Sequence, residues 1–439
     1  MQHSIGKYAY FNVLRDTRLV PFTYLASTQK KGKMLKRTRT SPRSQHTFGN
    51  SIVFVLKTNE GGMWILPQIK EALRRNYTVQ AIIPQGPGRL ARSLEKLSSI
   101  ESGLQVTPID YDFTFRASKS TFAGLWQLHQ MIKRSKAKLV FYHLYASALA
   151  VRIATFGNRS IRKVHMVAGP LYLENKLIRF VERFLCRLDS TIIAGSDYTR
   201  DKYIEIGMPK ERLVSIPYGV DTVKFDPESI ERSDSREEFD ISATDFVTIM
   251  VAYVYAPKSL VFPGVGIKGH ETALEAWRLF VADKSDARMV FVGSGFDGEG
   301  ELHRQQLIAQ AEQLGVSDSI TWIDSVDDVR TIYRCADLSM SPSLSENHGA
   351  LLEASSMAVP SIVSDAGALP EALAPNGGWV FPRGDSHSLA TKLEEAYKSW
   401  QAGELVQFGV NSRKLMLDEF DQSSCVTRVI DVITKQKRA

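Results

Sequence analysis

Residues 342–371 read PSLSENHGALLEASSMAVPSIVSDAGALPE, and this stretch says more about the chain than any other. It starts as a polar loop, continues as an apolar helix, breaks at Pro360 and ends in a short strand, Ser361–Ser364. Two carboxylates, Glu346 and Glu353, flank the start of the helix. A helix N-terminus carries unpaired backbone N–H groups and partial positive charge, which favour a phosphate or a sugar hydroxyl. Together these features indicate a nucleotide-sugar pocket.

The same segment resembles the donor-site signature of retaining glycosyltransferases with the two-Rossmann-domain (GT-B) fold. That group includes glycogen synthase and many bacterial polysaccharide glycosyltransferases. Its two signature glutamates have seven residues between them, whereas Glu346 and Glu353 have six. Aligning the second glutamate puts Ser345 in the position of the first. Either the loop is one residue shorter here or the first carboxylate is lost.

Length and periodicity agree with two domains. At 439 residues, with 44% hydrophobic and 23% charged residues, the chain is an ordinary globular sequence too long for one typical core. Strands and helices alternate, which predicts parallel sheets covered by helices on both faces. The resemblance implies an α/β GT-B architecture in which two Rossmann-like, doubly wound domains face a central cleft and a C-terminal helix crosses back.

The expected domain boundaries follow from composition and from the resemblance. Residues 213–227, LVSIPYGVDTVKFDP, closely match the group's exit from the first domain, and the acidic stretch 228–245 reads as a linker. The last helices are expected at 386–402 and 410–435. The expected units are a basic, disordered extension (1–47), an N-terminal acceptor-side domain (48–230), a C-terminal nucleotide-sugar domain (245–405) and a C-terminal helix returning to the first domain (406–439).

The net charge of +7 is concentrated in the first 47 residues, which hold ten Lys/Arg and one acidic residue. The rest of the chain has 45 basic and 47 acidic residues, so the basicity is interpreted as a property of the extension. Residues 30–43 are expected to be disordered. They would either contact anionic lipid headgroups or form a solvated extension without function. Nucleic-acid binding is not expected, because the extension has no interleaved aromatic residues.

The chain has no segment of about 18 uninterrupted apolar residues, which a membrane-spanning helix needs. The first 22 residues have charges spread through them and make a poor secretory signal. The three cysteines are scattered and predict neither a disulfide framework nor a zinc site. We therefore expect a cytoplasmic protein, with peripheral contact at the inner membrane face left open.

In the first domain, the resemblance singles out residues at the ends of strands. Gly61 and Gly62 follow the first strand, where the group's glycine loop lies between donor phosphate and acceptor. His143 closes the strand 138–144, where the group places a histidine that contacts the transferred sugar. His165 and Glu174 are further candidates for acceptor contact. From the residues alone, a purely structural role for each remains open.

In the second domain, the group has a Gly-Arg pair and then a Lys-Gly pair, whose two cations neutralise the leaving diphosphate. Here the first pair is replaced by Ala252-Tyr253, while the second is present as Lys268-Gly269. Lys268 is therefore the expected phosphate ligand. Candidates to replace the missing arginine are Lys258, Arg383 and Arg89.

The resemblance thus implies a complete set of site residues. The expected catalytic residues are His143, Lys268 and Glu346. The expected donor-binding residues are Gly61, Gly62, Lys268, Gly293, Glu346, Asn347, His348, Gly349, Ala350, Leu351 and Glu353. No Asp-x-Asp follows a strand, so no metal site is expected, and the only co-substrate would be the nucleotide sugar.

The implied activity is metal-independent retaining transfer of a hexose. The donor would be a UDP- or GDP-sugar, and the acceptor a hydroxyl of a glycan or a polyprenyl-linked glycan in exopolysaccharide, capsule or cell-envelope polysaccharide synthesis. Two alternatives stay open. The missing Gly-Arg pair and the short glutamate spacing are compatible with a non-catalytic binding or scaffold protein of the same fold. A nucleotide-sugar epimerase would have the same architecture.

Overall fold

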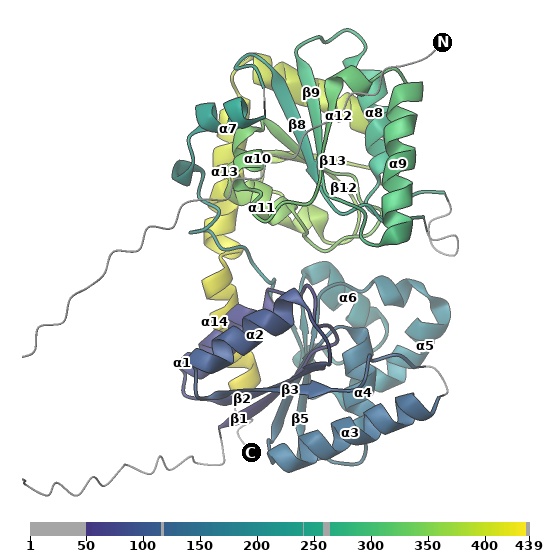
Figure 1. Ribbon diagram of the computed structural model, residues 1–439, viewed down its shortest axis with the longest axis vertical. Helices are drawn as coiled ribbons and strands as arrows, with labels where there is room; N and C mark the ends of the chain where they lie inside the picture. Colours follow the sequence, from purple (N-terminus) through teal and green to yellow (C-terminus); the bar gives the residue numbers. More distant parts are fainter. Residues whose placement is uncertain (1–49, 116–117, 240, 258–263, 436–439) are drawn as a thin grey trace, which may run out of the picture. The chain divides into compact units, whose positions relative to one another are not determined.

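The computed structural model describes residues 50–115, 118–239, 241–257 and 264–435 (Figure 1). The expected basic extension and Lys258 lie outside the described residues. None of the helices in these ranges contains an apolar stretch that could span a bilayer. Cys186, Cys335 and Cys425 are buried and free.

The first half of the described chain is built on a seven-stranded sheet in which all neighbours are parallel, in the order β3-β2-β1-β4-β5-β6-β7. The strand order reverses between β1 and β4, and doubly wound sheets bind ligands outside the carboxyl ends of the strands at such a point. The strands are β1 Ser51–Val55, β2 Thr78–Pro84, β3 Leu104–Ile109, β4 Leu139–His143, β5 Arg162–Val167, β6 Thr191–Ala194 and β7 Leu213–Ser215.

Helices cover both faces of this sheet. Figure 1 shows α1, α2 and α14 on one side and α3, α4 and α5 on the other. Each side has its own apolar core, which is why the strands are almost continuously hydrophobic. The helices of this half are α1 Ile65–Arg74, α2 Arg89–Ile100, α3 Lys119–Ser135, α4 Tyr145–Ala154, α5 Lys176–Leu185 and α6 Asp197–Glu205.

The second half repeats the plan with six parallel strands in the order β10-β9-β8-β11-β12-β13. Two such sheets confirm the expected α/β, Rossmann-like architecture. The strands are β8 Phe246–Val251, β9 Ala287–Val292, β10 Ile320–Ile323, β11 Leu338–Ser341, β12 Ser361–Ser364 and β13 Gly378–Phe381. The helices are α7 Arg232–Glu238, α8 His270–Val281, α9 Gly298–Gln313, α10 Arg330–Cys335, α11 Leu351–Ser356 and α12 Ser386–Gln401.

The prediction of one final helix over 410–435 is wrong, because two helices occupy this region, α13 Leu405–Glu419 and α14 Gln422–Thr434. Between them, the Phe420 carbonyl accepts from the Val220 N–H at 2.8 Å, and the Gln422 N–H donates to the Val220 carbonyl at 2.9 Å. Asp421 then caps α14 by accepting from the Ser424 N–H. These hydrogen bonds to Val220 replace the backbone bonds that would continue one helix through residue 421. The helical periodicity of the sequence does not reveal them.

The second of these helices returns to the first half of the chain. Cys425, Val429 and Ile430 of α14 are buried in the same core as Ile65 and Ile69 of α1. The last helix therefore packs on the first half of the chain, as the expected fold class requires.

An ionic cluster lies inside the first half, between α4, α5 and the start of β6. Arg152 donates to Glu182 at 2.7 Å and to Asp189 at 3.2 Å, and all three side chains are at most 1% exposed. Glu182 also accepts from the Tyr203 hydroxyl at 3.0 Å. Because every charge has hydrogen-bonded partners of the opposite sign or a hydroxyl donor, burial is tolerated.

We expect Arg152→Met to lower the free energy of unfolding by about 3–5 kcal/mol, because Glu182 and Asp189 would be left buried without their cation. Urea denaturation measures this change. The control is Arg134→Met, which alters an exposed arginine of α3 and should change stability by less than about 0.5 kcal/mol. Equal effects from the two substitutions would contradict the structural role of the cluster.

Candidate functional site

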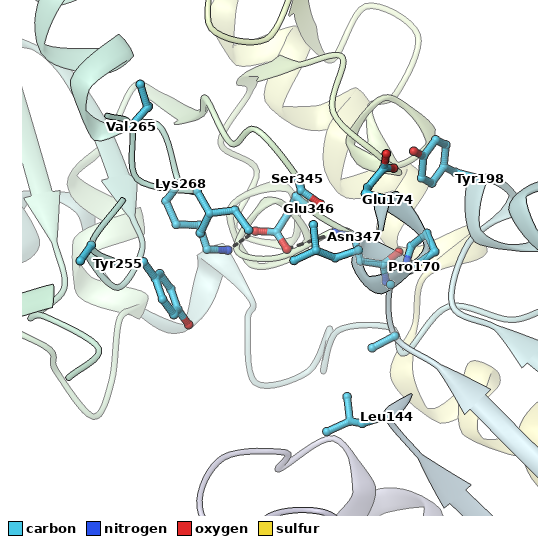
Figure 2. Close-up of a pocket in the computed structure, with 15 residues that line it drawn as sticks. Leu144, Pro170, Glu174, Tyr198, Tyr255, Val265, Lys268, Ser345, Glu346 and Asn347 are labelled. Carbon is cyan, nitrogen blue, oxygen red and sulfur yellow. Dashed lines mark hydrogen bonds and ion pairs between the residues drawn. The ribbon is translucent and has the colours of Figure 1, made fainter. Parts of the chain in front are cut away.

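A cavity of about 530 Å³ lies at the carboxyl ends of the strands and is walled by loops from both halves of the chain (Figure 2). Its polar wall comes from Lys268 and residues 345–347 of the second half. The first half contributes the loop after β5 and the start of α6. The lining residues are Leu144, Ala168, Gly169, Pro170, Leu171, Glu174, Tyr198, Tyr255, Ala256, Val265, Ile267, Lys268, Ser345, Glu346 and Asn347.

Lys268 and Glu346 form an ion pair in the wall of this cavity, drawn as a dashed line in Figure 2. Burial would lower the pKa of Lys268, but the charge of Glu346 and their hydrogen bond outweigh burial and raise it. The lysine therefore stays cationic at neutral pH. Among the described residues that line the cavity, Lys268 is the only basic one.

Glycines bring the two loops of this ion pair together. Gly269 has φ +75°, and a Cβ there would lie 2.1 Å from the Pro342 carbonyl oxygen. Gly367 has φ +60°, and its Cβ would lie 2.0 Å from the Glu346 carbonyl oxygen. The Leu344 N–H donates to the Ile267 carbonyl at 2.8 Å, which joins the loops directly. Only glycine permits both the left-handed backbone and the close approach.

The sequence left open whether Ser345 or Glu346 takes the position of the first signature glutamate. Both line the cavity, and the carboxylate that faces Lys268 is that of Glu346. Asn347, also an expected donor contact, lines the cavity too. Its Oδ1 is a buried acceptor without a hydrogen-bond partner in the described part of the chain.

The first half supplies a wall that the sequence only partly identified. Glu174, an acceptor-contact candidate, lines the cavity, whereas His165 is buried beside Tyr142 and does not. Tyr198 and Tyr255 also line it, and neither was expected. Tyr198 is the second residue of a helix that follows a strand, and this position at the ligand edge was the available signal.

His143 ends β4 as expected, but its side chain is buried and does not line the cavity. Its Nε2 lies 2.9 Å from Oε1 of Gln68, and its ring packs against Trp64 and Phe141. Burial lowers the pKa of His143 to about 3, so it is neutral at pH 7. The next residue, Leu144, is the one that reaches the cavity.

The expected glycine contacts also lie away from the cavity lining. Gly61 and Gly62 adopt φ +70° and +65° in the turn between β1 and α1. Gly293 has φ +141°, and a Cβ there would lie 2.2 Å from the Ala252 carbonyl oxygen. Close packing between the loops after β8 and β9 explains Gly293 without a ligand.

The remaining expected donor residues lie in or just before α11, behind the cavity wall. Gly349 has φ +51° and packs against Glu346, Ala350 precedes the helix, and Leu351 is buried. Glu353 accepts from the Tyr333 hydroxyl at 3.2 Å, and burial raises the pKa of its carboxyl. None of these lines the cavity, so their contact with a donor stays a prediction.

His348, in the same loop, does not line the cavity. It is buried, with its ring 5.2 Å from that of Phe420 between ring centroids, and its Nε2 has no partner in the described chain. Burial lowers the pKa of His348 to about 4. This histidine joins the loop to the end of α13.

No arginine fills the place of the missing Gly-Arg pair in the described structure. Tyr253 is half exposed, and Tyr255 stacks on Phe296 with ring centroids 4.6 Å apart. Arg383 donates to the Leu344 carbonyl at 3.2 Å, and neither it nor Arg89 lines the cavity. Within the described residues, aromatic rings stand where the group has a cation.

Two family models match most of the described chain. Residues 66–224 match Glycosyltransferase Family 4, and residues 265–415 match Glycosyl transferases group 1. The chain belongs to the GT-B glycosyltransferases. Within this family, its second-half match contains both members of the Lys268–Glu346 pair.

Curated relatives of this GT-B family member match over limited stretches. A D-inositol 3-phosphate glycosyltransferase of Nocardia farcinica is 25% identical over 206 residues, which are 46% of this chain and 43% of the relative. A GDP-mannose-dependent alpha-(1-6)-phosphatidylinositol monomannoside mannosyltransferase of Mycobacterium tuberculosis is 26% identical over 41% of this chain and 45% of its own. The chain thus spans less than half the length of these relatives.

Solved structures share the fold. HepE of Anabaena in complex with UDP has a TM-score of 0.71 and 18% sequence identity, over 88% of this chain and 99% of its own. A glycosyltransferase of Rickettsia africae has a TM-score of 0.71 and 16% identity, over 88% of this chain and 98% of its own. These likenesses confirm the two-domain GT-B architecture.

Replacement of Gly269 tests the close approach of its loop to Pro342. We expect Gly269→Ala to destabilise the protein by about 1–3 kcal/mol, because a Cβ at positive φ would meet the Pro342 carbonyl. The matched control is Gly298→Ala, where a Cβ would meet nothing within 4 Å. Thermal and urea unfolding measure both. A Gly269→Ala protein as stable as the control would show that the close approach is unimportant.

The burial of His348 predicts a pH dependence. The unfolded histidine takes up a proton below its ordinary pKa of 6.5, while the folded one does so only near pKa 4. Between these values the unfolded state binds more protons, so stability falls as the pH falls. The difference in unfolding free energy between wild type and His348→Asn should shrink by about 1.4 kcal/mol per pH unit in this window.

Urea titrations at several pH values between 6.5 and 4 measure that difference. A constant difference across the window would mean that His348 is protonated equally in the folded and unfolded states.

Proposed function

We propose that this protein transfers a hexose, with retention of anomeric configuration, from a UDP- or GDP-sugar to a hydroxyl of a glycan or a lipid-linked glycan in cell-envelope or exopolysaccharide synthesis. The observation that carries the proposal is Lys268, a cation kept charged by Glu346 in the wall of a cavity at the carboxyl ends of two parallel sheets. Such a cation suits a diphosphate.

Charge development in the reaction explains why this placement matters. As the glycosidic bond to the diphosphate breaks, negative charge grows on the leaving phosphate oxygen and positive charge grows at the anomeric carbon. Lys268 would stabilise the first. An arriving diphosphate would compete with Glu346 for the ammonium group, and the released carboxylate would then be free to accept a sugar hydroxyl.

The acceptor would approach from the first half of the chain. Glu174, Tyr198 and the loop at 168–171 face Lys268 across the same cavity. In a retaining transfer the acceptor attacks from the face that the diphosphate leaves, and a phosphate oxygen takes the acceptor proton. His143 is buried and neutral, so it fits a positioning role better than proton transfer.

The comparisons support the chemistry at a coarser level. The relatives are named for transfer to inositol 3-phosphate and to a phosphatidylinositol monomannoside, and one of them is named as GDP-mannose-dependent. HepE was crystallised with UDP-glucose. These names favour a nucleoside-diphosphate sugar as donor and a hydroxyl-rich acceptor, including one carried by a lipid.

A second candidate function, a non-catalytic sugar-nucleotide binding protein, is favoured by one observation. Ala252 and Tyr253 stand in the place of the Gly-Arg pair, and Lys268 is left as the single described cation of the cavity wall. Such a protein would bind the donor and transfer nothing.

Donor binding and turnover distinguish the candidates. A thermal-shift and hydrolysis panel of UDP- and GDP-sugars should reveal one donor that stabilises the wild type and is slowly hydrolysed. Lys268→Met should lower kcat for that donor by roughly 10²–10³, since it removes the cation opposite the leaving group. Glu353→Ala should weaken the stabilisation if this carboxylate contacts the donor as expected.

The control is Lys414→Met, an exposed lysine of α13, which should behave as wild type. Stabilisation by a sugar nucleotide without hydrolysis or transfer to any acceptor would favour the binding protein. Full turnover by Lys268→Met would contradict the proposed role of the lysine. If no nucleotide shifts the melting temperature, the proposal fails.

A further inference from the structure

Helix α5 has its apolar side facing solvent. Its one buried residue is the carboxylate Glu182. Leu177 is 72% exposed, Phe180 62% and Phe184 54%. With Val181 these residues follow the i, i+3, i+4, i+7 pattern of one helix stripe, which normally faces a core. The rings of Phe180 and Phe184 contact each other edge to face at 5.5 Å.

The ionic cluster explains this orientation. Glu182 lies on the side of α5 opposite the stripe and is held by Arg152 and Tyr203 inside the domain. Turning the stripe inward would expose Glu182 and leave Arg152 with one partner fewer in a buried site, which is costly. The folded structure therefore keeps the apolar stripe on the outside. Only a binding partner could remove this apolar surface from water.

The other helices on the same side of the first sheet also carry exposed apolar residues. On α3, Phe122 and Trp126 are 70% and 65% exposed. Ile153 of α4 and Phe156 just after it are 51% and 80% exposed. Figure 1 places α3, α4 and α5 on one side of this sheet. We call the exposed apolar residues of these three helices, with Phe156, the α3–α5 face.

The charge of this region is strongly positive, contrary to the interpretation that basicity belongs to the extension. Residues 118–189 hold 13 Lys/Arg and three acidic residues. Two of these acids, Glu182 and Asp189, are buried against Arg152. On α5 itself, Lys176, Arg179 and Arg183 are exposed and form no ion pair with described residues.

A basic cavity continues the positive charge beyond the end of α5. It has a volume of about 520 Å³ and is bordered by the exposed ring of Phe156. Arg159, Lys163, Arg187 and Arg212 line it, and its acid, Asp189, is already paired with Arg152. Lys163 is buried, and burial lowers its pKa. An anionic group bound there would stabilise the charged form of Lys163.

We propose that the α3–α5 face docks on an anionic lipid bilayer, with Phe180 and Phe184 entering the headgroup region and the surrounding Lys/Arg contacting lipid phosphates. A helix with a basic polar side and a Phe/Leu side fits that interface. A second copy of the chain fits it poorly, because a two-fold contact would set Arg179 and Arg183 against their own copies. Vesicle binding by the full chain does not require sugar transfer, so the proposal stands apart from the proposed function.

Vesicle cosedimentation with the full chain tests this. The wild type should bind vesicles that contain phosphatidylglycerol, bind phosphatidylcholine vesicles weakly, and lose affinity as salt rises. Phe180→Ser/Phe184→Ser should weaken binding about tenfold or more. Arg179→Gln/Arg183→Gln should weaken it roughly fivefold per charge. These side chains are exposed, so the melting temperature should stay unchanged.

Two controls locate the effect. Val406→Ser/Val410→Ser removes two exposed apolar residues from α13 and should bind vesicles as wild type does. Lys30→Gln/Lys31→Gln/Lys33→Gln removes charge from the extension and should leave most of the affinity. Stabilisation by the sugar nucleotide should be the same in every variant, which separates docking from the donor site.

Four results would overturn the proposal. The first is that the wild-type protein binds no vesicles, and the second is that the Phe180→Ser/Phe184→Ser variant binds them as the wild type does. The third is that only the extension variant loses affinity. The fourth is that the protein does not bind vesicles but forms a dimer, detected by light scattering, that the phenylalanine substitutions dissociate.

Discussion

Both described sheets are parallel throughout, and the rest of the molecule depends on this constraint. Parallel strands place all their carboxyl ends at one edge of the sheet, and the crossover helices must then cover both faces. The loops at that edge are therefore free to meet a ligand. Leu144, the loop at 168–171 and residues 345–347 are such loops, and they wall the cavity.

Loops acquire defined positions only when something holds them. Around Lys268 and Glu346 this is done by backbone contacts at Gly269 and Gly367, where a methyl group would overlap a carbonyl oxygen. The ion pair fixes the positions of the two side chains relative to each other. The cost of removing both charges from water offsets much of what the pair contributes to stability. A diphosphate that exchanges for Glu346 on the lysine would therefore find its cation already in place.

Sequence periodicity predicted the alternating elements well, because buried parallel strands are short apolar runs, and the strand expected at Ser361–Ser364 is β12 with these bounds. It failed at Phe420, where hydrogen bonds to Val220 divide the final helix. The resemblance to the family led to Lys268 and Glu346, which line the cavity, although the spacing of the two glutamates put Ser345 in the position of the first. Each of these two residues lies in the segment between a strand and the helix that follows it, β8 and α8 for Lys268 and β11 and α11 for Glu346.

The other expected site residues show what motif spacing cannot supply. His143 was placed correctly at the end of β4, yet its side chain turns into the aromatic packing around Trp64. Glu353 turns toward Tyr333. Tyr198 and Tyr255 enter the cavity from segments without a motif. Side-chain direction depends on neighbours from distant parts of the chain, which spacing along one segment does not encode.

Helix α5 separates the two kinds of information most clearly. The sequence by itself determined that this segment is an amphipathic helix, because apolar residues recur with helical spacing. It also determined the excess of positive charge over residues 118–189. Only the tertiary structure decided that the apolar stripe faces outward. The reason is that Glu182 is paired with Arg152, thirty residues earlier in the chain. Leaving one of these buried charges without its partner costs more free energy than exposing the Phe180 side chain to water.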